Sequence, residues 1–295
     1  MSAQNPPAPR MTVSAFRALK DSGTRIVMLT AYDYNSARLV EAAGIDAVLV
    51  GDSLGMTVLG HDSTLPVTLD DMLSATAAVS RACSRVLVVA DMPFMTYQVS
   101  HQEGMRNAGR LVAQAGAHAV KLEGATPSVL GLVRGLSEAG VPVMGHLGLT
   151  PQSVNALGGY RTQARDETAA AKLLADCLAL QDAGAFAVVL ECIPAELASR
   201  ATELVAIPTI GIGAGVGCSG EVQVFHDILG LGTFLPRHAK RYADLGERIV
   251  EAVAAYASDV RDSTFPTEAQ SSHVDPAVVS AASGAFVRHT SGGDS

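Results

Sequence analysis

The feature that most constrains the fold is a series of short apolar runs, each of which ends on an ionisable residue. Residues 47–50 are rich in Val and stop just before Asp52, and four later runs end in a similar way. Such runs are too short for helices and are typical of strands that are buried on both faces. Any strand must end somewhere, but five such endings in series predict that the ends converge on one polar site. The five ionisable residues are Asp52, Asp91, Glu123, His146 and Glu191.

The apolar runs alternate with longer segments that end at Gly or Pro, which predicts parallel strands joined by crossover helices. About eight such units in a chain of this length favour a (β/α)8 TIM barrel over an open doubly wound sheet. We expect the barrel domain to span residues 11–257, with a helix over residues 13–22 that plugs its N-terminal end. Residues 1–10 are predicted to form a disordered tail, and residues 258–295, rich in Ser, Ala and Gly, a flexible tail.

The composition argues against several classes of partner. A net charge of -8 and the lack of a Lys/Arg-rich run disfavour nucleic acid. No run approaches the roughly 18 apolar residues of a membrane span, and no signal peptide is recognisable. The four cysteines show no CxxC spacing, so free thiols are expected. We therefore expect a cytoplasmic protein with no membrane partner.

Side-chain alternation along the strands predicts which residues point into the barrel. Lys121 shares a face with Glu123, and Asp52 shares one with Val50. With Ser53 alongside, the site would then hold several carboxylates and only one lysine. Because these carboxylates repel one another, a divalent cation would offset their charge, and hard oxygen donors without thiols favour Mg²⁺.

Each of these residues also has a purely structural interpretation. An acid at a strand–helix junction often caps the next helix, although Lys121 has no such explanation. His146 could be a core histidine with satisfied hydrogen bonds. The segment 215–220 fits the GxGxxG pattern after a strand, but no good helix follows it, so we favour a tight turn over dinucleotide binding.

The motifs around these residues resemble those of the ketopantoate hydroxymethyltransferase family, also called 3-methyl-2-oxobutanoate hydroxymethyltransferase. The resemblance covers about residues 11–256, and one departure is Ser219-Gly220-Glu221, where many members have Asp-Gly-Gln. The motifs that carry it are Leu29-Thr30-Ala31-Tyr32-Asp33, Val50-Gly51-Asp52-Ser53-Leu54-Gly55, Ala90-Asp91-Met92-Pro93-Phe94, Val120-Lys121-Leu122-Glu123-Gly124, Gly145-His146-Leu147-Gly148-Leu149-Thr150-Pro151-Gln152 and Gly211-Ile212-Gly213-Ala214-Gly215.

The resemblance implies a barrel of the phosphoenolpyruvate/pyruvate type and an enzyme of pantothenate synthesis. Its reaction would transfer a hydroxymethyl group from 5,10-methylenetetrahydrofolate to 3-methyl-2-oxobutanoate, giving 2-dehydropantoate. The resemblance also implies a homo-oligomer, specifically a decamer. The implied roles are Asp52, Asp91 and Glu123 as magnesium ligands, Asp52, Ser53, Asp91 and Lys121 as substrate-binding residues, and Glu191 as the proton acceptor.

The residues suit this chemistry independently of the resemblance. A metal bound to a 2-oxo acid would stabilise its enolate, and a carboxylate such as Glu191 could remove the C3 proton. Lys121 could instead form a Schiff base, but the surrounding carboxylates should keep it protonated. Two rival functions stay open: a metal-dependent C–C lyase or mutase of the phosphoenolpyruvate/pyruvate barrel group, and a non-catalytic barrel that binds an acidic metabolite. The Lys-Lys-Cys-Gly-His loop common in such lyases is absent from this chain.

Overall fold

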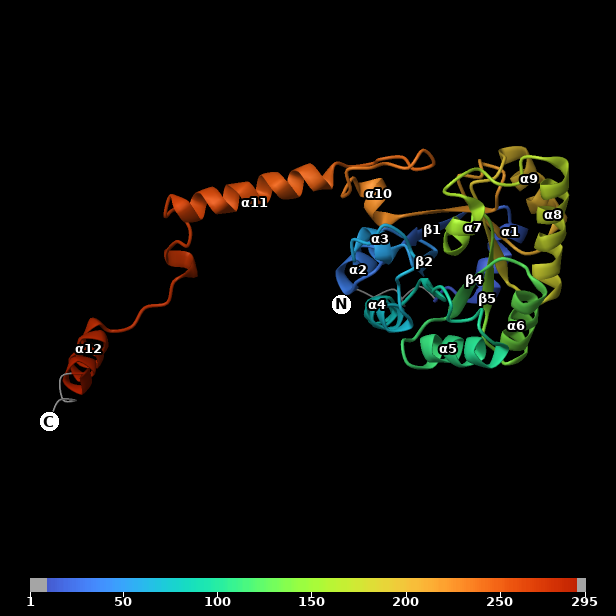
Figure 1. Cartoon of the computed structure of the whole chain (residues 1–295). Helices are drawn as coiled ribbons and strands as arrows, with labels where there is room; N and C mark the ends of the chain where they lie inside the picture. Colours follow the sequence, from blue (N-terminus) through green and yellow to red (C-terminus); the bar gives the residue numbers. More distant parts are fainter. Residues whose placement is uncertain (1–9, 291–295) are drawn as a thin grey trace, which may run out of the picture. The chain divides into compact units, whose positions relative to one another are not determined.

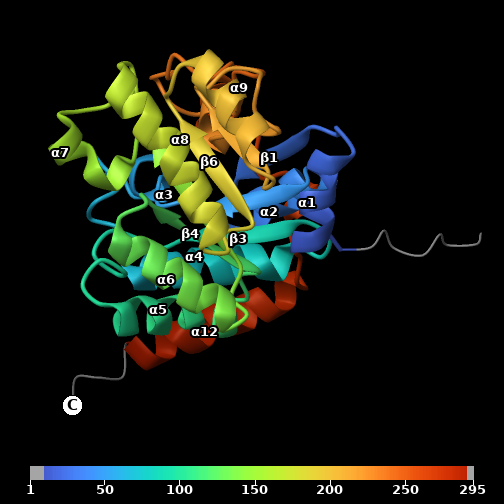
Figure 2. The same ribbon diagram turned by 90° about the vertical axis from the view of Figure 1, so that its right-hand side faces the viewer.

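The computed structural model describes residues 10–290 and contains a closed barrel of eight parallel strands. Neighbouring strands follow chain order, and the barrel closes where β8 pairs with β1. The predicted (β/α)8 barrel is therefore confirmed, and Figures 1 and 2 show the helices around the strands. The strands are β1 (Ile26–Thr30), β2 (Ala47–Val50), β3 (Leu87–Asp91), β4 (Ala119–Glu123), β5 (Val143–Gly148), β6 (Ala187–Glu191), β7 (Thr209–Ile212) and β8 (Gly220–Gln223).

Polar caps fix where many of the helices begin. The side chains of Thr12, Asp33 and Thr68 each accept a hydrogen bond from a backbone N–H in the first turn of the helix that follows. The α-helices are α1 (Val13–Asp21), α2 (Tyr34–Ala42), α3 (Leu54–Thr57), α4 (Leu69–Ala82), α5 (His101–Ala113), α6 (Pro127–Glu138), α7 (Val154–Leu157), α8 (Glu167–Asp182), α9 (Ala195–Leu204), α10 (Phe225–Leu229), α11 (Leu245–Arg261) and α12 (Pro276–Thr290), with 3-10 turns at η1 (Pro151–Ser153) and η2 (Glu268–Gln270).

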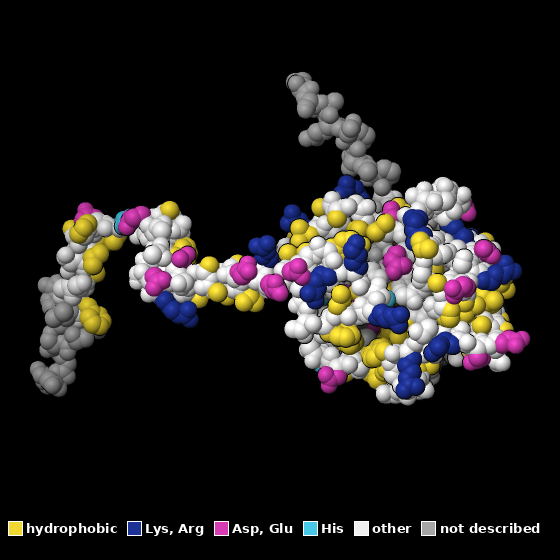
Figure 3. Space-filling model, turned by 90° about the horizontal axis from the view of Figure 1, so that it is seen from above, with side chains coloured by type: hydrophobic (Ala, Val, Ile, Leu, Met, Phe, Trp, Pro, Cys, Tyr) yellow, Lys and Arg dark blue, Asp and Glu magenta, His cyan; other side chains and the backbone are white. Residues whose placement is uncertain are grey.

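The chain divides into two compact units, with the boundary between Ala243 and Asp244. The second unit contains α11, η2 and α12; Figure 3 shows apolar side chains along α11. Every side chain from residue 262 to residue 286, in the expected tail, is exposed. The disorder expected over residues 1–10 falls, except for Arg10, outside the described residues. Within residues 10–290 no helix combines the length and the apolar character needed to cross a bilayer, and the four cysteines are free.

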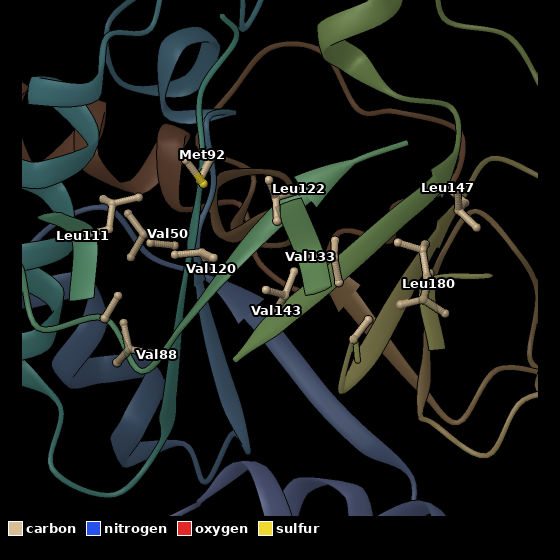
Figure 4. Close-up of a cluster of buried hydrophobic side chains, with 14 of the residues drawn as sticks. Val50, Val88, Met92, Leu111, Val120, Leu122, Val133, Val143, Leu147 and Leu180 are labelled. Atoms are coloured by element: carbon tan, nitrogen blue, oxygen red, sulfur yellow. The ribbon is translucent and has the colours of Figure 1, made fainter. Parts of the chain in front are cut away.

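Two apolar clusters account for the barrel core. The outer cluster lies between the strands and the helices, where Val50 and Val88 pack with Leu111 of α5 (Figure 4). The inner cluster fills the barrel and includes Leu49 and Val89. Our expectation that Asp52 shares an inward face with Val50 is therefore wrong. Strand β2 ends at Val50, so alternation along the strand does not reach a residue in the turn beyond it.

Helix α1 covers the N-terminal end of the barrel, as predicted. Its Phe16 belongs to the inner cluster and packs edge-on against Phe186, with ring centroids 5.7 Å apart. The α1 and α7 helices lie at opposite ends of the barrel (Figure 2). Lys20 Nζ donates to the carbonyl oxygens of Thr202, Val205 and Ile207 at 2.8, 2.6 and 2.9 Å, which ties α1 to the C-terminal end of α9.

A glycine allows the last strand to close the barrel. Gly220 of β8 pairs with Ile26 of β1, and a Cβ at Gly220 would lie only 2.4 Å from the Ile26 carbonyl oxygen. Any side chain at this position would push β8 away from β1. No helix separates β7 from β8 in the described chain, so the two strands are joined by the glycine-rich segment, which forms a turn.

Candidate active site at the strand ends

The carboxyl ends of strands β3, β4 and β5 bring four predicted site residues together. Parallel pairing sets Asp91 beside Lys121, and it sets Glu123 beside His146. These four side chains belong to residues that are at most 7% exposed, so they form a polar layer inside the barrel. Glu191, the last residue of β6, lies next to this layer.

Asp52 and Ser53 reach the same layer from the turn after β2. The Asp52 backbone N–H donates to Asp91 Oδ2 at 3.1 Å. A Cβ on Gly51 would lie 2.7 Å from Ser53 Oγ and 3.4 Å from Asp91 Oδ2, so these two side chains lie on the same side of the turn. Ser53 Oγ also lies 2.8 Å from the Tyr32 hydroxyl. We call Asp52, Asp91, Lys121, Glu123 and His146 the strand-end cluster.

Lys121 supplies the fixed positive charge of the strand-end cluster. Its Nζ lies 2.9 Å from Asp91 Oδ1 and 3.0 Å from His146 Nδ1. Burial alone would lower the pKa of Lys121, but Asp91, Glu123 and Asp52 together raise it above its usual value. A protonated lysine is no nucleophile, which supports ion pairing over a Schiff base as the role of Lys121.

His146 connects the strand-end cluster to Glu191. His146 Nε2 lies 3.1 Å from Glu191 Oε2, and Nδ1 lies 3.5 Å from Glu123 Oε1. Burial and Lys121 lower the pKa of His146, whereas contacts with Glu123 and Glu191 raise it, and the net result is a pKa of about 9. The Glu191 side chain is 14% exposed, compared with 5% for Glu123, so it is the more accessible carboxylate.

When all three are ionised, the carboxylates of the strand-end cluster carry more negative charge than Lys121 and a protonated His146 balance. Burial and the neighbouring Asp91 and Glu123 raise the pKa of Asp52 well above its usual value. Burial also raises the pKa of Asp91, although Lys121 opposes this shift. Additional positive charge would stabilise the ionised carboxylates.

The donor set fits a small hard cation such as Mg²⁺. Asp52, Asp91 and Glu123 offer carboxylate oxygens, and Asp91 Oδ1 lies 2.9 Å from Lys121 Nζ but forms no aligned hydrogen bond within the described residues. Among residues 10–290 no group of three or more His, Cys, Asp or Glu side chains is arranged to hold a metal ion. Mg²⁺ does not require such a cage, because it keeps several waters, and these can lie between the cation and some of the three carboxylates.

The loop after α7 places an aromatic ring near these carboxylates. Tyr160 is 51% exposed, and partial burial together with Glu191, Asp52 and Glu123 raises the pKa of its hydroxyl. The hydroxyl donates to Met56 Sδ of α3 at 3.8 Å. The two long loops that follow β2 and β5 therefore meet beside the site.

Two buried polar residues of the site were not predicted. Gln152, in the η1 turn after β5, donates from Nε2 to Asp52 Oδ2 at 2.8 Å. The Tyr97 hydroxyl donates to Gln152 Oε1 at 2.9 Å. The sequence carries Gln152 within a family motif, but neither its residue type nor its spacing marks it as part of a charged site.

Comparison with known proteins identifies close relatives over nearly the whole chain. Residues 10–268 match the family model described as Ketopantoate hydroxymethyltransferase. The chain is 57% identical over 276 residues to the 3-methyl-2-oxobutanoate hydroxymethyltransferase of Chloroflexus aurantiacus. The aligned residues make up 93% of this chain and 97% of that relative. It is 54% identical over 271 residues to the protein of the same name from Carboxydothermus hydrogenoformans, and the aligned residues make up 92% of this chain and 98% of that relative.

Solved structures with lower sequence identity share the fold. A phosphonopyruvate hydrolase in complex with oxalate and Mg²⁺ matches with a TM-score of 0.58 and 16% identity, covering 95% of this chain and 98% of that chain. A 2,3-dimethylmalate lyase, described as a PEP mutase/isocitrate lyase superfamily member, matches with a TM-score of 0.55 and 17% identity, covering 95% and 99%. These likenesses concern the barrel architecture alone.

Proposed function

The chain belongs to the ketopantoate hydroxymethyltransferase family, and we propose that its strand-end cluster and Glu191 carry out the reaction that this name describes. A hydroxymethyl group passes from 5,10-methylenetetrahydrofolate to 3-methyl-2-oxobutanoate, giving 2-dehydropantoate. This reaction would be the first step of pantothenate synthesis. We also propose that the enzyme works in the cytoplasm, where its four free cysteines would stay reduced.

The position of Glu191 is the observation that carries this proposal. Glu191 contacts His146 at 3.1 Å but is more accessible than the acids of the strand-end cluster. A carboxylate at this place can accept the C3 proton of the oxo acid without serving as a metal ligand. The carbon that loses this proton then forms the new C–C bond to the one-carbon unit of the folate.

Lys121 and Ser53 suit the binding of the oxo acid. The Lys121 ammonium group is buried beside Asp91, and its protonated state allows a charge-assisted hydrogen bond to a substrate oxygen. The Ser53 hydroxyl, next to Asp52 and in contact with Tyr32, offers a neutral donor. Together with Asp52 and Asp91 these groups would orient the substrate so that C3 faces Glu191.

Asp52, Asp91 and Glu123 would hold Mg²⁺ in this enzyme. A cation bound there would supply positive charge that stabilises the negative charge developing on the substrate when C3 loses its proton. The same charge would offset the burial and the carboxylate repulsion that together raise the pKa of Asp52 in the protein alone.

The direct test follows product formation by NMR with the oxo acid, methylenetetrahydrofolate and Mg²⁺. We expect 2-dehydropantoate, almost no turnover after the metal is stripped, and recovery when Mg²⁺ is added back. Full turnover in excess chelator would rule out the metal role. Cleavage of isocitrate-like substrates without folate would instead indicate a lyase, and binding without turnover would indicate a non-catalytic barrel.

We further propose that the enzyme is a homo-oligomer, a decamer by the family resemblance. Ile249, Val253, Tyr256 and Val260 form one stripe along α11 and are 52, 59, 58 and 45% exposed. None of the α11 residues is buried within the described structure. A second copy of the chain would cover this stripe, so light scattering should detect a smaller assembly for Val253→Glu. An unchanged mass would exclude α11 from the interface.

A further inference from the structure

Gln152 occupies a place in the site that the proposed chemistry does not yet use. It lies in the η1 turn after β5, is 6% exposed, and contacts residues that follow or end three other strands. We propose that Gln152 is a positioning residue that orients two of the metal-binding carboxylates, those of Asp52 and Glu123, for the cation. This inference rests on the proposed magnesium site.

The amide of Gln152 can have only one orientation in this environment. Its Nε2 donates to Asp52 Oδ2 at 2.8 Å and to the Met92 carbonyl oxygen at 2.9 Å. Its Oε1 accepts from the Tyr97 hydroxyl at 2.9 Å and from Gln98 Nε2 at 3.1 Å. A flipped amide would direct its oxygen at a carboxylate and a carbonyl, and these groups can only accept hydrogen bonds. The four contacts therefore hold the N–H donor toward Asp52.

The backbone of the same residue holds the second carboxylate. The Gln152 N–H donates to Glu123 Oε2 at 3.0 Å, and the Glu123 N–H donates to the Tyr97 hydroxyl at 3.1 Å. Gln152, Tyr97 and Glu123 thus form a closed hydrogen-bonded ring. One turn after β5 thereby ties together the ends of β2, β3 and β4.

These bonds use one oxygen of each carboxylate and leave the other available. Asp52 is held through Oδ2, and no hydrogen bond to its Oδ1 is formed within residues 10–290. Glu123 is held through Oε2, and its Oε1 lies 3.5 Å from His146 Nδ1. Without the Gln152 donors, repulsion among Asp52, Glu123 and Asp91 would favour rotation of the carboxylates away from one another. Outer-sphere hydrogen bonds of this kind are typically worth about 10- to 100-fold in metal affinity.

The test measures metal affinity directly, with Mn²⁺ as an electron paramagnetic resonance probe and no substrate present. Gln152→Met keeps the length of the side chain but removes the amide, so we expect Mn²⁺ to bind about 10- to 100-fold more weakly. Gln114→Met makes the same change at an exposed position at the end of α5 and should leave the affinity unchanged. Circular dichroism melting of each variant confirms that the barrel is folded.

Tyr97→Phe provides a second, independent variant, which serves even where Gln152→Met folds poorly. It removes the hydroxyl that orients the amide, so we expect a smaller loss of Mn²⁺ affinity. The Tyr97→Phe/Gln152→Met double variant should lose less than the product of the two single losses, because Tyr97 acts in part through Gln152. Wild-type affinity in both single variants would overturn the inference. A wild-type protein that binds no Mn²⁺ would overturn the magnesium site as well, so the two failures are distinguishable.

Discussion

Glu191 is the residue on which the proposed chemistry depends most directly. Glu191→Gln keeps the size of the side chain but removes the base, so we expect turnover to fall by about 10²- to 10⁴-fold. Mg²⁺ and oxo-acid affinities should change much less, because Glu191 is not assigned to the metal. Steady-state kinetics and isothermal titration calorimetry of the variant measure these two effects separately.

Exchange of the C3 hydrogen in D₂O isolates the proton-transfer step from the rest of the reaction. Wild-type protein with Mg²⁺ should exchange this hydrogen without folate, and Glu191→Gln should not. Undiminished exchange in the variant would move the base elsewhere. The next candidate is His146, at 3.1 Å from Glu191, because removing the Glu191 carboxylate removes one of the contacts that raise the pKa of His146. A loss of metal binding would instead identify Glu191 as a ligand.

His118, just before β4, should make stability depend on pH. Its Nδ1 accepts from the Val88 backbone N–H at 2.9 Å, which requires the neutral ring. Burial and nearby Arg10 lower its pKa from 6.5 to about 4. Between these pH values the unfolded chain binds the proton more readily than the folded chain. The stabilisation that the neutral His118 ring contributes is therefore complete above pH 6.5 and is lost as the pH falls toward 4.

The size of this pH effect follows from the partial burial of the His118 ring. Because water screens part of the effect, we expect the free energy of unfolding of the wild type to fall by about 1 kcal/mol more than that of His118→Asn between pH 7 and pH 5. Asn keeps an acceptor but does not titrate, so it is the matched reference. Urea unfolding at the two pH values measures the difference, and equal losses in both proteins would contradict the assignment.

Residue-level predictions from the sequence succeeded where the residue lies within a strand. Lys121 and Glu123 point inward because alternation holds along β4, and Ala119 of the same strand face lies in the inner cluster. Asp52 reaches the site although Val50 faces outward, because a turn resets the direction of the side chain. Gln152 could not be predicted, since its contacts depend on the geometry of the η1 turn.

At the scale of elements, the short pieces inside long loops escaped prediction. The alternation of apolar runs with longer segments that end at Gly or Pro predicted crossover helices between the strands, and α6 (Pro127–Glu138) is one of them. Helices α3 and α7 have four residues each, too few for a periodic pattern to show in the sequence. Helix α3 carries Met56, and Tyr160 follows α7. The two helices that the sequence pattern missed therefore lie beside the site.

The attachment of α1 to α9 gives an element-scale prediction. Lys20→Met keeps the aliphatic stem but leaves three carbonyl oxygens at the end of α9 without their charged donor. We expect the free energy of unfolding to fall by about 2 kcal/mol, the usual range for hydrogen bonds to a charged group. Denaturant titration measures the change.

An exposed lysine on another helix provides the control for this experiment. Lys172 pairs with Asp176 on the surface of α8, and its side chain is 70% exposed. Lys172→Met should change the free energy of unfolding by less than about 0.5 kcal/mol. If the two variants were equally stable, the Lys20 contacts would contribute no more than an ordinary surface pair.

At the scale of the whole molecule, we propose that residues after Phe265 are dispensable for the chemistry. This segment holds η2 and α12, and none of its side chains up to residue 286 is buried. Truncation after Phe265 should leave turnover nearly intact and keep the melting temperature within about 2 °C, because little apolar surface is lost. Calorimetry and the product assay measure both, and a collapse of activity would show that the segment packs against another part of the enzyme.

The pairing of β1 with β8 also sets the order of events when the chain is made. Strand β1 leaves the ribosome first, yet one of its edges stays unpaired until Gly220–Gln223 has been synthesised. Contacts between such distant segments form slowly, and an unpaired edge strand can recruit strands of other chains in the meantime. The yield of folded enzyme therefore depends on how quickly β8 finds β1, so crowding of nascent chains would lower this yield without altering the finished protein.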